Sequence, residues 1–422
     1  MLHHTALDVC HAPCAEHGAL HSLALSRRSA ITRERIRILA IRLPLHRAIK
    51  RKRMNIQMPS SRNEFVGYQI ILTAPKQVQI REYAEPPLPP NEVRLQTLYS
   101  GISAGTELTQ YRGTNPYLNK RWDAERRMFL PGENPTAYPV TNWGYEEVGQ
   151  VVEVGDAVKR VQPSDRIWGS WGHKSTHIVT EDWAAARLLD SALDPLCGIF
   201  SHVGAIALNV ILDAEIHLGE FVAIFGQGVM GLVVTQLARL HGGTVIAVDG
   251  IARRLELARA GGADYTINFH QQEPAETIKQ LTHGRGADVS IEITGSYDAL
   301  HTAIRATAYN SKVIAAGFYQ GEGRGLELGD EFHHNRIQIV SSQISGSNPR
   351  LQHRWERLRL NQTVMQLQAQ KRLNLLPLVT HHFAARDAAA AFALLDTDSL
   401  DAVQVVLDFA KPDPVHSHFG VE

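Results

Sequence analysis

Short apolar runs recur at regular intervals in the second half of the chain. Runs such as FVAIF and TVIAVD are typical of strands buried on both faces, and the segments between them, such as residues 229–242, have helical length and spacing. This alternation predicts βαβ units with a parallel sheet covered by helices on both faces. Six runs predict a doubly wound, six-stranded sheet of the dinucleotide-binding type, with strands beginning near Phe221, Thr244, Tyr265, Asp288, Lys312 and Ile337.

The first part of the chain follows a different pattern, in which apolar and polar residues alternate. Residues 65–83 predict a hairpin with a turn at Ala-Pro-Lys, and residues 92–103 predict a further strand. The last strand-like run, residues 402–409, does not continue the rhythm of the second half and is expected to fold back onto the first domain. The fold class is therefore α/β, with a β-rich domain over residues 59–200 and 346–412 and a doubly wound domain over residues 201–345.

A long segment, residues 113–143, interrupts the β-rich region. It is rich in Pro and Asn and carries Trp122, Arg126, Arg127 and Trp143. Long loops in compact domains often cover a binding site, and the aromatic and arginine side chains favour that role here. We expect this segment to act as a lid.

The composition excludes several classes of protein. Hydrophobic residues make up 44% and charged residues 20% of 422 residues, as in ordinary globular proteins. No apolar run in the sequence is long enough to predict a membrane span. Three cysteines, Cys10, Cys14 and Cys197, cannot form a disulfide framework, so we expect a reducing compartment, the cytoplasm.

The net charge of zero conceals an uneven distribution. Residues 1–53 hold eleven Lys and Arg against three acidic residues, which leaves 32 basic and 40 acidic residues in the remainder. A nucleic-acid or membrane arm, a targeting peptide and sequence translated ahead of the true start are the possible interpretations of the basic leader. We favour a disordered or non-native leader over residues 1–58. The acidic remainder argues against nucleic acid as a partner.

A glycine pattern marks the first strand of the doubly wound region. Gly226, Gly228 and Gly231 follow that strand directly and open a helix. The first glycine allows a tight turn, the second lets the backbone approach a pyrophosphate, and the third lets helix and strand pack closely. The N–H groups at the helix N-terminus then face the phosphates. The pattern predicts a dinucleotide site.

An acidic residue ends the next strand. A carboxylate at Asp249 would accept hydrogen bonds from both adenosine ribose hydroxyls and repel a 2′-phosphate, so it favours NAD over NADP. Arg253 and Arg254 leave NADP open, since either guanidinium could pair with a phosphate.

Several stretches between residues 64 and 410 form a recognisable set: SGISAGTEL, GYEEVGQVVEVG, FGQGVMG, SIEITGS, AAGFYQG and THHFAARDAAAAFALL. With them the chain resembles the medium-chain dehydrogenase/reductase superfamily. The resemblance implies a GroES-like, β-rich catalytic domain, a Rossmann domain and a homodimer or homotetramer. Within the superfamily, SGISAGTE and RWERLRL are most similar to the group that contains bacteriochlorophyllide 2-hydroxyethyl dehydrogenase. With the glycine pattern the matching stretches give the candidate cofactor-binding residues Gly226, Gly228, Val229, Met230, Gly231, Asp249, Arg254, Thr294 and Gly317.

The resemblance also raises the question of zinc. Zinc-using members carry cysteine after Gly-Ile in the first motif and histidine between Gly and Glu in the second. This chain has Ser103 and Ala104 in the first region and Tyr145 in the second. The third ligand position falls near His202, and residues 100–196 contain no cysteine for a structural zinc lobe. One imidazole without a thiolate cannot build the three-ligand catalytic site, so we predict no zinc and no other metal. A rebuilt site with His202, Glu146 and Glu107 is the alternative.

Without zinc, protein groups must stabilise or move the substrate proton. Thr106 matches the superfamily's proton-relay hydroxyl, and the Tyr145 phenol could donate to a carbonyl oxygen or take an alcohol's proton. His202 could continue the relay to solvent, and Glu146 matches an acid that lies behind the zinc. The alternatives are a core aromatic for Tyr145, a packing residue for His202 and a structural pair with an arginine for Glu146.

These observations predict an NAD(P)-dependent oxidoreductase that interconverts a secondary alcohol and a ketone by hydride transfer, without catalytic zinc. The lid-like segment favours a bulky small-molecule substrate. Two alternatives remain: an NADPH-dependent enone or quinone reductase, and a catalytically inactive nucleotide-binding redox sensor.

Overall fold

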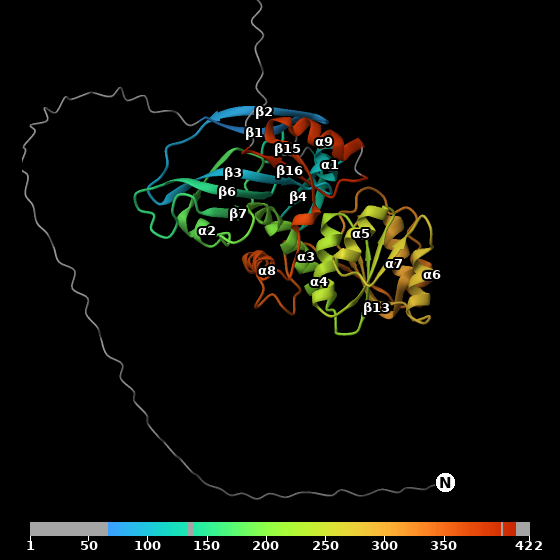
Figure 1. The fold of residues 1–422 in the computed structure, drawn as a ribbon. Coiled ribbons are helices and arrows are strands. Elements are labelled where there is room, and N and C mark those ends of the chain that lie inside the picture. Colours follow the sequence, from blue (N-terminus) through green and yellow to red (C-terminus); the bar gives the residue numbers. More distant parts are fainter. Residues whose placement is uncertain (1–65, 133–137, 398–399, 411–422) are drawn as a thin grey trace, which may run out of the picture. The chain divides into compact units, whose positions relative to one another are not determined.

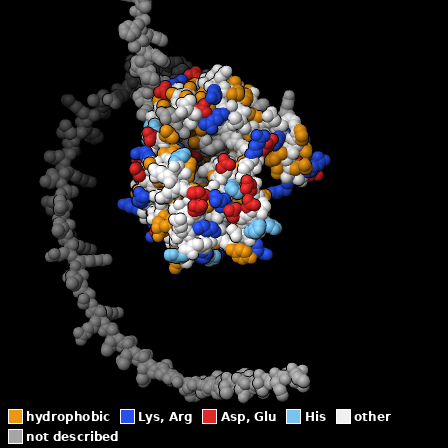
Figure 2. Space-filling model, turned by 90° about the vertical axis from the view of Figure 1, so that its right-hand side faces the viewer, with side chains coloured by type: hydrophobic (Ala, Val, Ile, Leu, Met, Phe, Trp, Pro, Cys, Tyr) orange, Lys and Arg blue, Asp and Glu red, His pale blue; other side chains and the backbone are white. Residues whose placement is uncertain are grey.

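The computed structural model describes residues 66–132, 138–397 and 400–410. The expected basic leader, residues 1–58, lies outside the described residues. On the face seen in Figure 2, acidic and basic side chains are interspersed.

The apolar runs of the second half form one parallel sheet, as predicted. Its order is β11-β10-β9-β12-β13-β14, the arrangement of a doubly wound dinucleotide-binding fold. Figure 1 shows helices packed around it. The strands are β9 (Phe221–Phe225), β10 (Thr244–Asp249), β11 (Tyr265–Asn268), β12 (Ala287–Glu292), β13 (Thr307–Ala315) and β14 (Gln338–Ser341). The helices are α4 (Val229–Leu240), α5 (Ala252–Ala260), α6 (Pro274–Leu281) and α7 (Tyr297–Ala306).

Alternation along β9 explains how the sheet is covered. Val222 and Ile224 belong to the core cluster that contains α4, whereas Ala223 and Phe225 belong to the cluster that contains α6 and α7. Because successive strand side chains point to opposite faces, an unbroken apolar strand fills both cores.

The first part of the chain forms the predicted hairpin and a second sheet. The C-terminal strand β16 pairs antiparallel with β3, so the chain does return to this sheet. The sheet has the order β15-β16-β3-β6-β7, with β8 also on β3. The hairpin is β1 (Val66–Ala74) and β2 (Gln77–Ala84), and the sheet strands are β3 (Glu92–Ile102), β6 (Glu146–Val154), β7 (Arg166–Gly169), β8 (Thr176–Thr180), β15 (Val379–Ala384) and β16 (Gln404–Asp408). Short helices α1 (Glu107–Arg112), α2 (Glu181–Ala185) and α9 (Ala388–Thr397) accompany them.

Two longer helices, α3 (Phe200–Ala214) and α8 (Arg357–Ala369), pack against each other. The stretch Pro195–Ala214 is long and apolar enough to cross a membrane by length and composition, but 78% of the most apolar window is buried inside the fold. Its apolar side chains belong to the same core cluster as β9 and α4. This burial identifies α3 as a core helix.

The segment 113–143 is not one lid, and the prediction for Trp143 is wrong. Part of the segment is regular, with a short helical turn (Pro116–Asn119) and the hairpin β4 (Lys120–Asp123) and β5 (Met128–Pro131). Trp143 is only 2% exposed and stacks on Phe392 with ring centroids 4.0 Å apart. Trp122, in contrast, is 48% exposed on the hairpin. The second tryptophan is a core residue because α9 offers it an aromatic partner.

Candidate functional site

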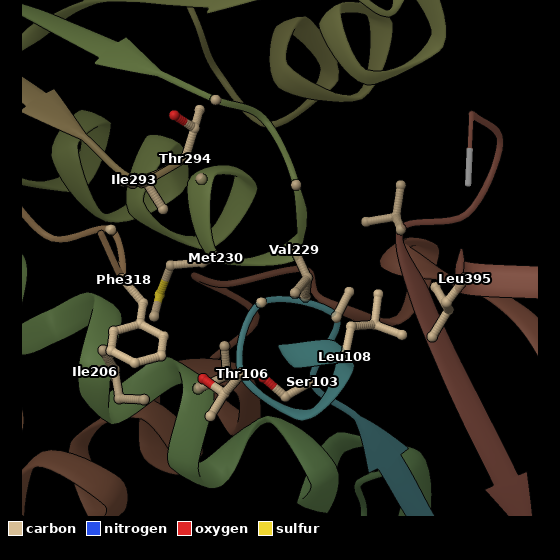
Figure 3. Close-up of a pocket in the computed structure, with 18 of the residues that line it drawn as sticks. Ser103, Thr106, Leu108, Ile206, Val229, Met230, Ile293, Thr294, Phe318 and Leu395 are labelled. Carbon is tan, nitrogen blue, oxygen red and sulfur yellow. The ribbon is translucent and has the colours of Figure 1, made fainter. Parts of the chain in front are cut away.

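One cavity brings together most of the predicted site residues. It has a volume of about 480 Å³ and lies where the carboxyl ends of β9, β10, β12 and β13 meet α3 and the loop before α1. Figure 3 shows side chains from these elements around Ser103 and Thr106. All nine candidate cofactor-binding residues line it, namely Gly226, Gly228, Val229, Met230, Gly231, Asp249, Arg254, Thr294 and Gly317. Of the four candidate catalytic residues, Thr106, Tyr145 and Glu146 line it and His202 does not.

The three glycines have the geometry that a pyrophosphate site requires. Gly226 has φ +94°, in the left-handed region that side chains disfavour. A Cβ on Gly231 would overlap the carbonyl oxygen of Gly226, whereas a Cβ on Gly228 would meet only open space. α4 begins at Val229 without a side-chain cap, so its first N–H groups are available to an anion. These residues fit the phosphates of a dinucleotide.

Asp249 is fixed at the end of β10. One carboxylate oxygen accepts from the Gln227 N–H at 2.7 Å and the other from the Ile251 N–H at 2.9 Å. Each oxygen keeps a further lone pair that can accept from a ribose hydroxyl. The Arg254 guanidinium lines the same cavity and donates to the carbonyl of Ala402 at 3.1 Å. The site therefore offers the carboxylate of Asp249 and the guanidinium of Arg254 to the adenosine end of a cofactor.

A buried acid that the sequence analysis did not single out holds two cavity loops. Glu292 at the end of β12 accepts from the N–H groups of Thr294 at 2.7 Å and Gly295 at 3.2 Å and from the Tyr319 hydroxyl. Burial raises the pKa of Glu292, although the bonds from Thr294, Tyr319 and Gly295 oppose the rise. Glu292 thus positions the backbone beside Gly317 and Thr294.

Tyr145 precedes β6, and its hydroxyl donates to the hydroxyl oxygen of Ser103. Burial raises the pKa of Tyr145, and the nearby Glu146 and Glu107 raise it further, while bonds to Ser103 and Thr106 lower it. The phenol is therefore protonated at neutral pH. A protonated phenol on a cavity wall can donate to a substrate oxygen.

His202 contacts Tyr145 through the ring edge, not through a hydrogen bond to its hydroxyl. The ring centroids are 5.0 Å apart at 79°. The Arg357 guanidinium lies 3.2 Å from Nδ1 of His202. Burial, with the charge of Arg357, lowers the pKa of His202 to about 4, so the imidazole is neutral at pH 7. The expected relay from Tyr145 through His202 therefore has no direct bond at its first step.

Glu146 is 1% exposed, and no arginine among the described residues forms an ion pair with it, which leaves the structural-pair alternative without support there. Its carboxyl accepts from the amide of Gln404 at 3.2 Å. Burial raises the pKa of Glu146 well above its ordinary value, and Glu107 and Glu147 add to the rise. Burial therefore favours the protonated form of this carboxyl on the cavity wall.

A buried ionic chain lies behind the cavity, and the sequence analysis missed its centre, His173. Nε2 of His173 lies 2.8 Å from Glu107, and Nδ1 lies 2.7 Å from the Ser100 hydroxyl, which donates to Glu147 at 2.9 Å. Because Ser100 gives its one hydrogen to Glu147, it accepts from Nδ1, and the ring donates from both nitrogens. Burial opposes charge on this ring, yet Glu107 and Glu147 raise the pKa of His173.

The hydrogen bonds around His173 also position the loop that carries Ser103. The second oxygen of Glu107 accepts from the N–H of Ser103 at 3.0 Å, so His173 holds Glu107 and Glu107 holds Ser103. The contact between Glu107 and His173 could not be predicted from sequence spacing, because the two residues are 66 positions apart.

Ser103, Tyr145 and His202 are the residues that the sequence resemblance places at or near the positions of catalytic zinc ligands. The first two are hydrogen-bonded to each other, and the third faces a guanidinium. In the part of the chain that the structure describes, no three His, Cys, Asp or Glu side chains are grouped to hold a metal ion.

Known proteins are similar to this chain in sequence. Residues 229–360 match the family model described as zinc-binding dehydrogenase. The chain is 30% identical over 306 residues to a D-guloside 3-dehydrogenase of Shigella flexneri, covering 71% of this chain and 87% of the relative.

Solved structures share the fold. A protein from Sinorhizobium meliloti 1021 described as a zinc-binding dehydrogenase, bound to NADP, superposes with a TM-score of 0.65 at 21% identity, and the match covers 82% of this chain and 100% of that one. An alcohol dehydrogenase from Escherichia coli CFT073, complexed with NADH, has a TM-score of 0.64 at 21% identity, with coverages of 82% and 99%.

Proposed function

The chain belongs to the medium-chain dehydrogenase/reductase superfamily, and from this premise we propose that it interconverts a secondary alcohol and a ketone with NAD(P) and without catalytic zinc. The observation that carries the proposal is that the Tyr145 phenol lines the same cavity as the dinucleotide glycines. It is an oxidoreductase, as its relatives are.

The nicotinamide cofactor, when bound, accepts or supplies the hydride. In ketone reduction Tyr145 donates its phenolic proton to the carbonyl oxygen, which stabilises the negative charge as it develops, and it regains a proton from the hydroxyl of Ser103 or Thr106, which in turn takes one from solvent. In alcohol oxidation the substrate proton moves to the Tyr145 oxygen as the phenol's own proton passes to the hydroxyl of Ser103 or Thr106, which releases its hydrogen to solvent. Thr106 is exposed on the cavity wall, so it provides the exit to solvent.

The donor set supports zinc independence. A hydroxyl, a phenol of raised pKa and an imidazole beside a guanidinium do not fit the thiolate and imidazole ligands that a catalytic zinc prefers. The rebuilt alternative lacks support because the carboxyls of Glu107 and Glu146 face His173 and Gln404.

The substrate class follows from the relatives and the cavity. Because a relative is a D-guloside 3-dehydrogenase, we propose a ring hydroxyl of a glycoside or another bulky polyol as the reacting group. The hydroxyls of Ser103 and Thr106 and the carboxyl of Glu146 can bind further substrate hydroxyls. We also propose the domain division at residues 200 and 346, a homo-oligomer and a cytoplasmic location.

A substrate screen tests this proposal. Protein treated with EDTA and dialysed should still reduce NAD⁺ or NADP⁺ with at least one alcohol from a panel of polyols, glycosides and sterols, and metal analysis should find far less than one zinc per chain. One zinc per chain, removed by the chelator with loss of rate, contradicts zinc independence. NADPH-driven enone reduction without alcohol turnover supports the reductase alternative, and cofactor binding without any turnover supports the sensor.

Cofactor choice can be tested at Asp249. Replacing Asp249 with Asn keeps the shape but removes the charge, so the affinity for NAD⁺ should fall about tenfold, as expected for one charge-assisted hydrogen bond. The affinity for NADP⁺ should not fall, because repulsion of the 2′-phosphate is removed. Fluorescence titration with both cofactors measures the two constants.

Arg254 provides the opposite test. If the enzyme uses NADP, Arg254→Ala should weaken NADP⁺ binding and leave NAD⁺ binding unchanged. Arg253 is an exposed neighbour that does not line the cavity, so Arg253→Ala should change neither affinity.

Unchanged NAD⁺ affinity in Asp249→Asn would contradict the proposal that the carboxylate binds the ribose.

A further inference from the structure

Three aromatic side chains of the 113–132 region are exposed to solvent side by side. Tyr117 is 41%, Phe129 42% and Trp122 48% exposed. Tyr117 stacks on Phe129 with centroids 5.0 Å apart, and Trp122 is the cross-strand partner of Phe129 at 4.9 Å. Contiguous exposed apolar surface of this kind marks a binding site more often than an accident of packing.

This aromatic row (Tyr117, Phe129 and Trp122) is continuous with the cavity. Tyr117 contacts Phe318 with centroids 5.7 Å apart, and Phe318 is a cavity wall residue that follows Gly317. Figure 3 shows the Phe318 ring beside Met230 and Ile206. The row therefore leads outward from the cavity, and Phe318 connects the cavity wall to Tyr117.

The cavity leaves little room for the rest of a large substrate. Sites of drug-sized ligands measure about 300 to 1,000 Å³, and a dinucleotide is larger than most such ligands. A cofactor held by all nine candidate residues fills most of the 480 Å³, so only the reacting end of a substrate fits beside it. A bulkier substrate must extend past Phe318.

We propose that the aromatic row is a second substrate subsite, which holds a flat, apolar group attached to the reacting alcohol, such as the aglycone of a glycoside. The proposal rests on the proposed function. Flat apolar groups pack against aromatic rings, and the row offers two ring pairs in sequence, one stacked and one tilted at 58°. The occupant is part of the substrate because the row joins the cavity through Phe318.

Paired substrates test the subsite. Methyl and 2-naphthyl glycosides of the same sugar share the reacting hydroxyl and differ only in the apolar group. In the double variant Trp122→Ala/Phe129→Ala, KM for the naphthyl glycoside should rise about tenfold with little change in kcat, as expected from lost apolar burial of two half-exposed rings. Kinetics with the methyl glycoside should not change. Tyr309→Ala, at a 65% exposed tyrosine on β13, is the matched control.

The outcomes separate this proposal from the proposed function. Equal effects on both glycosides, or none on either, overturn the subsite while alcohol turnover still stands. If neither glycoside is turned over, calorimetric binding of the naphthyl glycoside to the cofactor-loaded protein decides, because it should be lost in the double variant and kept in the control. A change of oligomeric state in the double variant, seen by light scattering, would instead assign the row to an interface between copies. Binding of wild type but not the variant to anionic vesicles would assign it to a membrane surface.

Discussion

Replacing Tyr145 with phenylalanine should lower kcat at least about 100-fold and leave the affinity for the nicotinamide cofactor unchanged. A positioned acid–base group contributes about 10² to 10⁴ in rate, and the variant loses only the hydroxyl. The ring, its edge contact with His202 and its packing remain. Steady-state kinetics in both directions, with cofactor affinity from fluorescence titration, measure the two effects.

A matched control is available at Tyr83 on β2. The Tyr83 hydroxyl bonds to Thr176 and does not line the cavity, so Tyr83→Phe should keep full turnover. If Tyr145→Phe also keeps full turnover, Tyr145 is a core aromatic and the acid–base role falls to another group on the cavity wall.

The raised pKa of Tyr145 predicts how the rate of ketone reduction depends on pH. Burial raises this pKa above the ordinary value of 10.0, so the phenol stays protonated through the neutral and mildly alkaline range. Ketone reduction should therefore show no loss of rate from ionisation of Tyr145 below about pH 10.

The doubly wound sheet could be predicted because its signal is local. Each strand is a short apolar run, and five of the six begin within one residue of the predicted position. The exception is β13, which begins at Thr307 rather than at Lys312. Tyr309 and Asn310 in its first half are exposed, so no apolar run announces it, while the buried Thr307 bonds to Ser290 of the neighbouring strand.

The cofactor side of the site could be predicted for the same reason. Gly226, Gly228 and Gly231 lie within six residues, and their conformations serve one turn. The other side depends on residues brought together by strand pairing. Glu146 and Glu147 lie opposite Gly101 and Ser100 across β3 and β6, and no sequence spacing gives that register.

Trp143 shows why an aromatic residue in an irregular segment does not define a lid. From composition alone Trp122 and Trp143 are indistinguishable. Trp122 is exposed on a hairpin, however, whereas Trp143 is buried against α9. The difference is the partner, Phe392, which is 249 residues further along the chain.

The largest effect on stability is expected at His173. Replacing it with glutamine removes the imidazole whose protonation Glu107 and Glu147 favour, and leaves both buried carboxyl groups without a cationic partner at this position. Breaking a buried ion pair by removing one partner costs about 3–5 kcal/mol. Denaturant unfolding of wild type and variant measures the difference.

His177 is the matched control. It lies close in sequence, is partly buried and stacks on Trp171, but burial lowers its pKa to about 3, so its ring is neutral. His177→Gln therefore removes packing without removing a charge and should cost less than His173→Gln. Equal losses in the two variants would contradict a charged His173.

The difference in unfolding free energy between wild type and His173→Gln should also depend on pH, which gives an independent test. Because the pKa of His173 is raised above 6.5 in the folded state, its stabilising contribution is complete below pH 6.5 and declines as pH rises through the folded pKa. The gap in unfolding free energy between wild type and His173→Gln should therefore narrow on going to alkaline pH. Since Glu107 also holds the N–H of Ser103, turnover of the variant should fall while cofactor affinity is kept, because the dinucleotide residues belong to other elements.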